Sequence, residues 1–159
     1  MPTENKPMAG SATSSSPDPK KNELLATLFE CGWRQCEPHL EPFEMTLGQV
    51  LYEAGSRPEY VYFPITGVVS LQHPMADGAL AEIAAVGDQG IVGVGLVVGH
   101  AGAPSRAVVR GAGTGFRLKA QLVREELNRA GPVMDVMLRY SQTLLAQMVR
   151  NAAQFCASR

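Results

Sequence analysis

The sequence lacks the marks of several classes of protein. It has three cysteines among 159 residues, an odd number at irregular spacing, which excludes the disulfide framework of a small secreted domain. No run of about 20 apolar residues could cross a membrane, and the first 21 residues contain no apolar signal core, so we expect a cytoplasmic protein with free thiols. Fourteen basic residues face 15 acidic ones. This balance argues against a chain whose main role is to coat nucleic acid.

The composition that remains is that of one globular domain. Hydrophobic residues make up 45% of the chain, enough to bury a large core without disulfides or metal. Residues 1–21 are rich in Ser, Pro, Thr and Lys and cannot bury enough apolar surface to offset the entropy of ordering. We therefore predict a disordered tail over 1–21, a domain over 22–130 and a separate long helix over 131–159.

Between the tail and residue 119, short alternating segments follow one another with turn residues between them. Phe43, Met45 and Leu47 alternate with polar residues, which is typical of a half-buried strand. Asp77-Gly78 is a strong hairpin signal between apolar runs. No long helix separates these segments, so six to eight strands are expected to form an antiparallel sheet structure rather than a parallel one.

The C-terminal residues predict an amphipathic helix of about seven turns. Such a helix either docks along the sheet or pairs with a copy of itself, and we favour pairing because the apolar stripe is longer than one compact sandwich covers. Ser141 and Asn151 weaken the stripe as a coiled coil. The predicted dimerisation residues are Met134, Met137, Leu138, Ser141, Leu144, Leu145, Met148 and Phe155.

Four stretches carry a resemblance to a known family. They are HLEPFEMTLGQVLYEAGSRPEYVYFPITGVVSLQ (39–72), IAAVGDQGIVGVGLVVG (83–99), SRAVVRG (105–111) and LRYSQTLLAQMVRNAAQF (138–155). With the order of elements, they resemble the Crp/Fnr transcription regulators over about residues 22–159. The resemblance implies a cyclic-nucleotide-binding-like jelly roll with flanking helices, a homodimer through the long helix, and a winged helix-turn-helix that reads DNA. The chain ends where that DNA-binding domain would begin, so we expect a sensor truncated before it, with DNA as a partner only in a longer form.

The resemblance also implies where an effector would bind. Cyclic-nucleotide binders of the family use a Gly-Glu pair for the ribose and a later Arg-Ser or Arg-Thr pair for the phosphate. Here Val94 stands where the Glu is expected, and the later pair reads Ser105-Arg106, in reverse order. Because the ribose acceptor is missing, we expect a different small effector, or none. The candidate effector-binding residues are Gly90, Gly93, Ser105 and Arg106, with Arg106 as the anion partner unless the reversed order turns it out of the pocket.

The remaining residue patterns do not predict a metal site or a catalytic site. Cys31, Cys36 and His39 are metal-ligating types, but no fourth ligand is near, so core packing is the better interpretation. The three histidines are isolated, whereas a cupin enzyme needs two close histidines and a carboxylate. We therefore expect no catalytic residue, no metal and no cofactor. The alternative to a sensor is a ligand-free interaction module that pairs with full-length regulators through residues 134–155.

Overall fold

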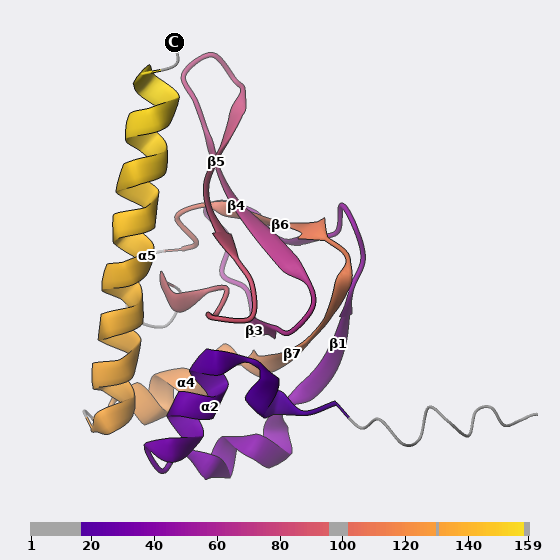
Figure 1. The fold of residues 1–159 in the computed structure, drawn as a ribbon, viewed down its shortest axis with the longest axis vertical. Helices are drawn as coiled ribbons and strands as arrows, with labels where there is room; N and C mark the ends of the chain where they lie inside the picture. Colours follow the sequence, from indigo (N-terminus) through magenta and orange to yellow (C-terminus); the bar gives the residue numbers. More distant parts are fainter. Residues whose placement is uncertain (1–16, 96–101, 130, 158–159) are drawn as a thin grey trace, which may run out of the picture.

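Seven strands and their flanking helices make up the part of the chain that the structure describes (Figure 1). The structure is a computed structural model, and it describes residues 17–95, 102–129 and 131–157, with the side chains of 155–157 excepted. In chain order the elements are η2 (Pro19–Lys21), α2 (Glu23–Glu30), η3 (Arg34–His39), β1 (Glu41–Met45), β2 (Val50–Tyr52), β3 (Tyr60–Pro64), β4 (Val68–Pro74), β5 (Leu80–Val86), β6 (Arg106–Gly111), β7 (Gly113–Lys119), α4 (Ala120–Leu127) and α5 (Pro132–Ala157).

The strands form two antiparallel sheets, ordered β1-β7-β3 and β2-β6-β4-β5. Neighbours such as β1 and β7 are far apart in sequence, which is the connectivity of a jelly roll. Fully buried side chains from both sheets, among them Phe63, Leu118, Val69 and Val109, fill the core. The predicted fold, a mainly antiparallel roll with flanking helices and a long C-terminal helix, is confirmed.

The β4–β5 hairpin shows how local sequence sets the register. Gly78 has φ +89°, a left-handed conformation that Gly adopts without steric cost. The Asp77 side chain accepts a hydrogen bond from the backbone N–H of Ala79 at 3.0 Å, and Met75 N–H donates to the carbonyl of Ala79 at 2.7 Å. The Asp-Gly turn signal therefore lies where the sequence predicts it, and the hairpin projects along α5 (Figure 1).

Helix α5 docks against the strand at the edge of the four-stranded sheet. An edge strand leaves backbone N–H and C=O groups without partners. Gln147 accepts a hydrogen bond from Ala85 N–H at 2.8 Å, and Asn151 donates one to the carbonyl of Ile83 at 3.0 Å. Figure 1 shows α5 running beside β5. The polar Asn151, which weakens the helix as a coiled coil, thus binds the edge of β5.

This docking corrects part of the predicted dimer interface. Met137 is fully buried and Leu144 is buried in the chain's own core, together with Val133 and Val136. Neither Met137 nor Leu144 can serve a second chain, because both side chains already pack against the roll. For this face of α5, the docking alternative is the one that the structure adopts.

The N-terminal boundary also differs from the sequence-based one. Residues 19–21, at the end of the predicted tail, form η2, which the Asp18 side chain caps by accepting a hydrogen bond from Lys20 N–H at 3.0 Å. The rest of that tail, residues 1–16, lies outside the described residues.

Asn22 ties three elements together from a fully buried position. Its side-chain oxygen accepts a hydrogen bond from Leu25 N–H at 2.9 Å, which caps α2. Its amide nitrogen donates to the carbonyls of Pro64 at 2.8 Å and of Gly90 at 2.9 Å. The start of α2 is thereby fixed to the end of β3 and to the turn over 87–90.

The Asn22→Ala variant should lose about 3 kcal/mol of unfolding free energy. The helix cap contributes about 1 kcal/mol, and each of the two carbonyls left buried without a donor costs about 1 kcal/mol or more. Urea denaturation measures the loss. Asn128→Ala, at an exposed asparagine whose side chain makes no hydrogen bond within the described residues, is the matched control and should change stability by less than about 0.5 kcal/mol. Equal losses in the two variants would contradict the role of Asn22.

Candidate functional site

A cavity of about 100 Å³ lies between the roll and α5. Tyr52 comes from β2 and Leu71 from β4, while α5 closes the cavity from the other side. Gly93 has φ +108°, a turn conformation that a side chain would strain. The described residues of the lining carry no charged side chain, and they are Tyr52, Leu71, Gly93, Val94, Gly95, Pro104, Ser105, Leu144 and Met148.

Two residues in this lining, Ser105 and Tyr52, are buried and carry a hydroxyl group. Ser105 is 2% exposed and Tyr52 is 8% exposed. Neither hydroxyl makes a hydrogen bond with another described residue, whereas the buried Ser70 hydroxyl accepts one from Gln72 at 3.4 Å. An unsatisfied buried hydroxyl costs about 1–3 kcal/mol. The cavity therefore combines apolar walls with two groups that can bind one polar atom of a ligand.

The tyrosines around the cavity stay uncharged at neutral pH. Burial raises the pKa of Tyr52 well above its usual range, and the nearby phenols of Tyr62 and Tyr140 raise it further. Burial also raises the pKa of Tyr140 to about 12, and the Tyr140 hydroxyl donates a hydrogen bond to the Ile91 carbonyl at 3.4 Å. A ligand in this cavity thus meets a neutral surface.

Of the four predicted effector residues, the structure brings Gly93 and Ser105 together at the cavity. Arg106 is not among the lining residues. Its Nε lies 3.1 Å from the Glu53 carboxylate, and one of its terminal nitrogens lies 3.4 Å from the Gln72 side-chain oxygen. Ser105, just before β6, lines the cavity, whereas Arg106, the first residue of β6, faces the Glu53 and Gln72 side chains. Of the two orientations that the sequence leaves open for Arg106, the structure has the one outside the cavity.

Gly90 lies outside the cavity lining as well, and it serves packing. A Cβ atom added to Gly90 would overlap the Tyr140 phenol of α5. Its carbonyl accepts the hydrogen bond from Asn22. Gly90 is therefore the point at which the start of α2 and the middle of α5 meet the roll.

Sequence reasoning missed Tyr52, Leu71 and Pro104 as site residues. Tyr52 and Leu71 come from β2 and β4, which are not neighbours in the sheet, and each reads as an ordinary apolar strand position. Leu144 and Met148 were predicted only for dimerisation. No spacing in the sequence marks these residues as belonging to one cavity.

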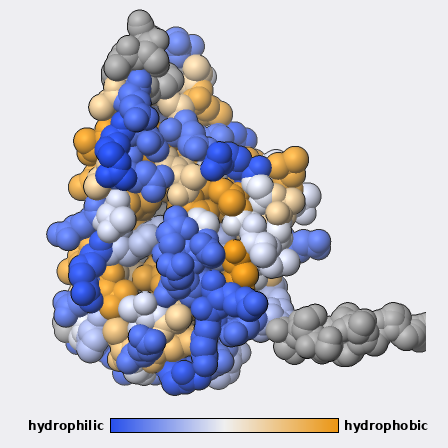
Figure 2. Space-filling view, in the orientation of Figure 1, coloured by the Kyte–Doolittle hydropathy of each residue, from blue (hydrophilic) through white to orange (hydrophobic). Residues whose placement is uncertain are grey.

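The other face of α5 carries exposed apolar side chains. Leu138 is 48%, Leu145 60% and Val149 60% exposed. These three lie at i, i+7 and i+11, on one side of the helix, and apolar groups gather along the molecular edge formed by α5 in Figure 2. Val149 is an addition to the predicted set. Among the other predicted residues, Met134, Ser141 and Met148 are half-buried, and the side chain of Phe155 lies outside the described residues.

Of the three candidate metal ligands, Cys36 belongs to the core, whereas Cys31 is half-buried and His39 is exposed. Cys36 is buried, and its thiol donates to the Trp33 carbonyl at 3.2 Å. Burial raises the pKa of this thiol to about 12, so it remains protonated. Within the described ranges, no group of three or more His, Cys, Asp or Glu side chains could hold a metal ion. In the same ranges, no helix has the length and apolar character to cross a membrane.

Comparison with known proteins supports the fold. No protein-family model and no curated protein matches the chain. Among solved structures, it is similar to the regulatory subunit of a cAMP-independent protein kinase A from Trypanosoma brucei, in a mutant bound to cAMP, with TM-score 0.66 and 21% identity over 78% of this chain and 44% of that one. A cyclic nucleotide-binding domain from Methylobacillus flagellatus gives TM-score 0.60 and 16% identity over 79% and 71%.

The N-terminal domain of a transcriptional regulator from Streptomyces coelicolor gives TM-score 0.57 and 19% identity over 87% of this chain and 94% of that one. The chain spans less than half the length of the trypanosome kinase subunit. At these identities the likeness shows the fold alone, which is that of a cyclic nucleotide-binding jelly roll.

The unpartnered hydroxyls lead to an unusual expectation for stability. Ser105→Ala and Tyr52→Phe should leave the unfolding free energy unchanged or raise it by up to about 1 kcal/mol, because each removes a buried polar group that has no partner. Ser70→Ala is the matched control and should cost about 1 kcal/mol, since its hydroxyl is hydrogen-bonded. Urea denaturation measures the unfolding free energy of the three variants. A loss of more than about 1 kcal/mol in Ser105→Ala would mean that a water or another group satisfies the hydroxyl.

The buried phenols predict a loss of stability in alkali. The folded state raises the pKa of Tyr140 from 10 to about 12, so the unfolded chain releases its proton first as the pH rises. The stabilisation that the buried Tyr140 phenol contributes is complete below pH 10 and is lost between pH 10 and about 12. Over this interval the unfolding free energy falls by up to about 1.4 kcal/mol per pH unit per phenol. Urea denaturation at several pH values tests this, and Tyr140→Phe should flatten the slope. An unchanged slope would contradict the assignment.

Proposed function

We propose that this chain is a regulatory sensor domain that binds a small neutral molecule in the cavity and responds through α5. The observation that carries the proposal is the pair of buried hydroxyls of Ser105 and Tyr52, which have no hydrogen-bond partner among the described residues, in a described lining that is otherwise apolar. Domains of this fold in the compared structures include a kinase regulatory subunit and a part of a transcriptional regulator.

The cavity does not suit a cyclic nucleotide. Pockets for ligands of that size hold about 300 Å³ or more, whereas this cavity holds about 100 Å³. A cyclic phosphate needs a guanidinium or backbone N–H groups, and the nearest candidate, Arg106, is paired with Glu53. Val94 offers no acceptor for a ribose hydroxyl. An effector of a few heavy atoms with one polar group fits the lining better.

Helix α5 is the element that would report binding. Leu144 and Met148 of α5 form one wall of the cavity, while Leu138 and Leu145 on the same helix face solvent. A ligand that favours a displaced α5 would shift the helix population toward that position. The displacement would then reach whatever the exposed face contacts.

Phenol is a suitable probe, because it joins an apolar ring to one hydroxyl. We expect saturable amide shifts in NMR at residues 93–95, 105 and 144–148, with a Kd on the order of 1 mM, and no saturable shift with cyclic AMP or cyclic GMP. Ser105→Val, which replaces the hydroxyl with one methyl group and adds a second, should weaken phenol binding about tenfold. Thr143→Val, at an exposed position on α5, should not.

Two results would redirect the proposal. Saturable cyclic AMP binding would show that the cavity opens to admit a nucleotide. The absence of saturable NMR shifts with phenol and with both cyclic nucleotides would favour the ligand-free interaction module.

Homodimerisation through α5 forms the second part of the proposal. The exposed side chains Leu138, Leu145 and Val149 form an apolar stripe that covers three turns of the helix. Two such stripes can pack together, as in a two-stranded coiled coil. A Crp/Fnr-like regulator that carries a DNA-binding domain in a longer form is the setting in which this dimer would act.

Leu145→Lys should convert a dimer into a monomer. A charge placed at the centre of an apolar helix pair is buried without a partner, so the dimer dissociation constant should rise at least tenfold. Sedimentation or light scattering over a range of concentrations measures this shift. Thr143→Lys adds the same charge at an exposed position two residues away, on another side of the helix, and is the control. A monomeric wild-type chain at about 100 μM would count against the dimer.

A further inference from the structure

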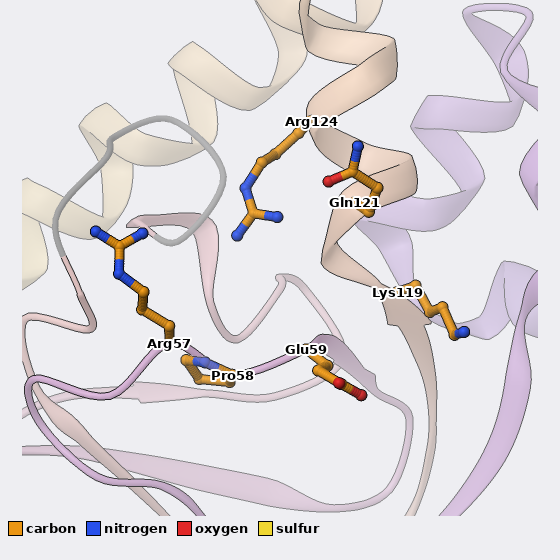
Figure 3. Close-up of a pocket in the computed structure, with 6 residues that line it drawn as sticks. All are labelled: Arg57, Pro58, Glu59, Lys119, Gln121 and Arg124. Carbon is orange, nitrogen blue, oxygen red and sulfur yellow. The ribbon is translucent and has the colours of Figure 1, made fainter.

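A groove of about 430 Å³ lies between the segment that precedes β3 and the first turns of α4 (Figure 3). Among the described residues, it shares no lining residue with the cavity at α5. The described residues that line it are Arg57, Pro58, Glu59, Lys119, Gln121 and Arg124.

Backbone pairing holds the two walls of the groove in place. Tyr60, the first residue of β3, pairs with Lys119, the last residue of β7. Directly beside this pair, Ala120 N–H donates to the carbonyl of Glu59 at 2.7 Å. Pro58 restricts the backbone of the first wall. The lining side chains therefore project from a fixed frame, and binding need not order the backbone.

The side chains concentrate positive charge. Arg57 and Arg124 extend from opposite walls toward the same end of the groove (Figure 3). Lys119 adds a third cation, whose ammonium group points away from the two guanidinium groups in Figure 3, and Glu59 is the only carboxylate among the described residues of the lining. The chain as a whole has a net charge of −1, so this local excess is a property of the groove.

The cations of the α4 wall lack carboxylate partners. Five arginines elsewhere each lie within 3.7 Å of a glutamate oxygen. Lys119 and Arg124 form no ion pair with any described residue. The positive charge of Arg57 adds to the field irrespective of its own contacts. At least two cations are thus available to an anion that enters the groove.

We propose that this groove binds the phosphate group of a small organic phosphomonoester. A guanidinium fork matches phosphate oxygens with two parallel hydrogen bonds, and a lysine adds a point charge. The volume of about 430 Å³ lies in the range of small-ligand pockets and exceeds what inorganic phosphate alone needs. Three cations around one short groove are too few and too local for a nucleic-acid backbone.

The site would communicate with the cavity through the backbone, and as a second ligand site it goes beyond the proposed function. Gly55 N–H donates to the carbonyl of Ala103, and Ala103 N–H donates to that of Ser56, both at 2.8 Å. Arg57 follows this pairing directly, and Ser105 lies two residues after Ala103. An anion held between Arg57 and α4 therefore contacts a segment that is bonded to the cavity wall.

The test is an NMR titration of the whole chain with glucose 6-phosphate, with glucose and inorganic phosphate as companions. Saturable amide shifts are expected at residues 57–59 and 119–124 with the ester and none with glucose. Arg124→Gln should weaken binding at least tenfold, since a charged hydrogen-bonding partner is lost. Glu59→Gln should tighten it about twofold, because a like charge is removed. This gain cannot arise from misfolding.

Arg110→Gln is the matched control. Arg110 pairs with Glu82 in the other sheet, so its loss removes one positive charge away from the groove and should leave the Kd unchanged. No saturation up to about 10 mM ester, or an equal weakening in Arg110→Gln and Arg124→Gln, would overturn the site. If inorganic phosphate binds as tightly as the ester, the proposal that the ligand includes an organic group is wrong. None of these readouts depends on the cavity or on dimerisation.

Discussion

The docking of α5 on the exposed edge of β5 is the constraint on which the rest of the structure depends. An open sheet edge invites pairing with other chains, and here the Gln147 and Asn151 side chains occupy two of its backbone groups. Val133, Val136 and Met137, in the first turns of the same helix, are buried in the core as well. Without α5, the edge of the four-stranded sheet would lose its cover, and these side chains would lose their burial.

Helix α5 thereby faces three different environments. One side of α5 fills the core, a second closes the small cavity with Leu144 and Met148, and a third leaves Leu138, Leu145 and Val149 to solvent. Because these faces belong to one rigid element, a change at the cavity cannot remain local. Tyr140 adds a further link, since its phenol packs on Gly90, which Asn22 ties to the start of α2.

The sequence predicted the fold well because its signals were local. The Asp77-Gly78 turn, the alternating strands and the long C-terminal helix each depend on residues close together in the chain. The site was predicted only in part. Gly93 and Ser105 lie at the cavity, but Tyr52 and Leu71 reach it from strands that are not sheet neighbours. Nothing in the spacing of apolar residues shows which strands will face one another.

The sequence by itself determined an antiparallel roll with flanking helices, since alternation and turn chemistry decide between strand and helix before any long-range contact forms. Only the tertiary structure decided how the apolar residues of α5 divide between core and solvent. That division depends on which side of the helix packs against β5. The helical periodicity of the sequence does not show which side this is. It also decided that Ser105 lines the cavity while Arg106, the first residue of β6, pairs with Glu53, because these contacts join segments that are far apart in the sequence.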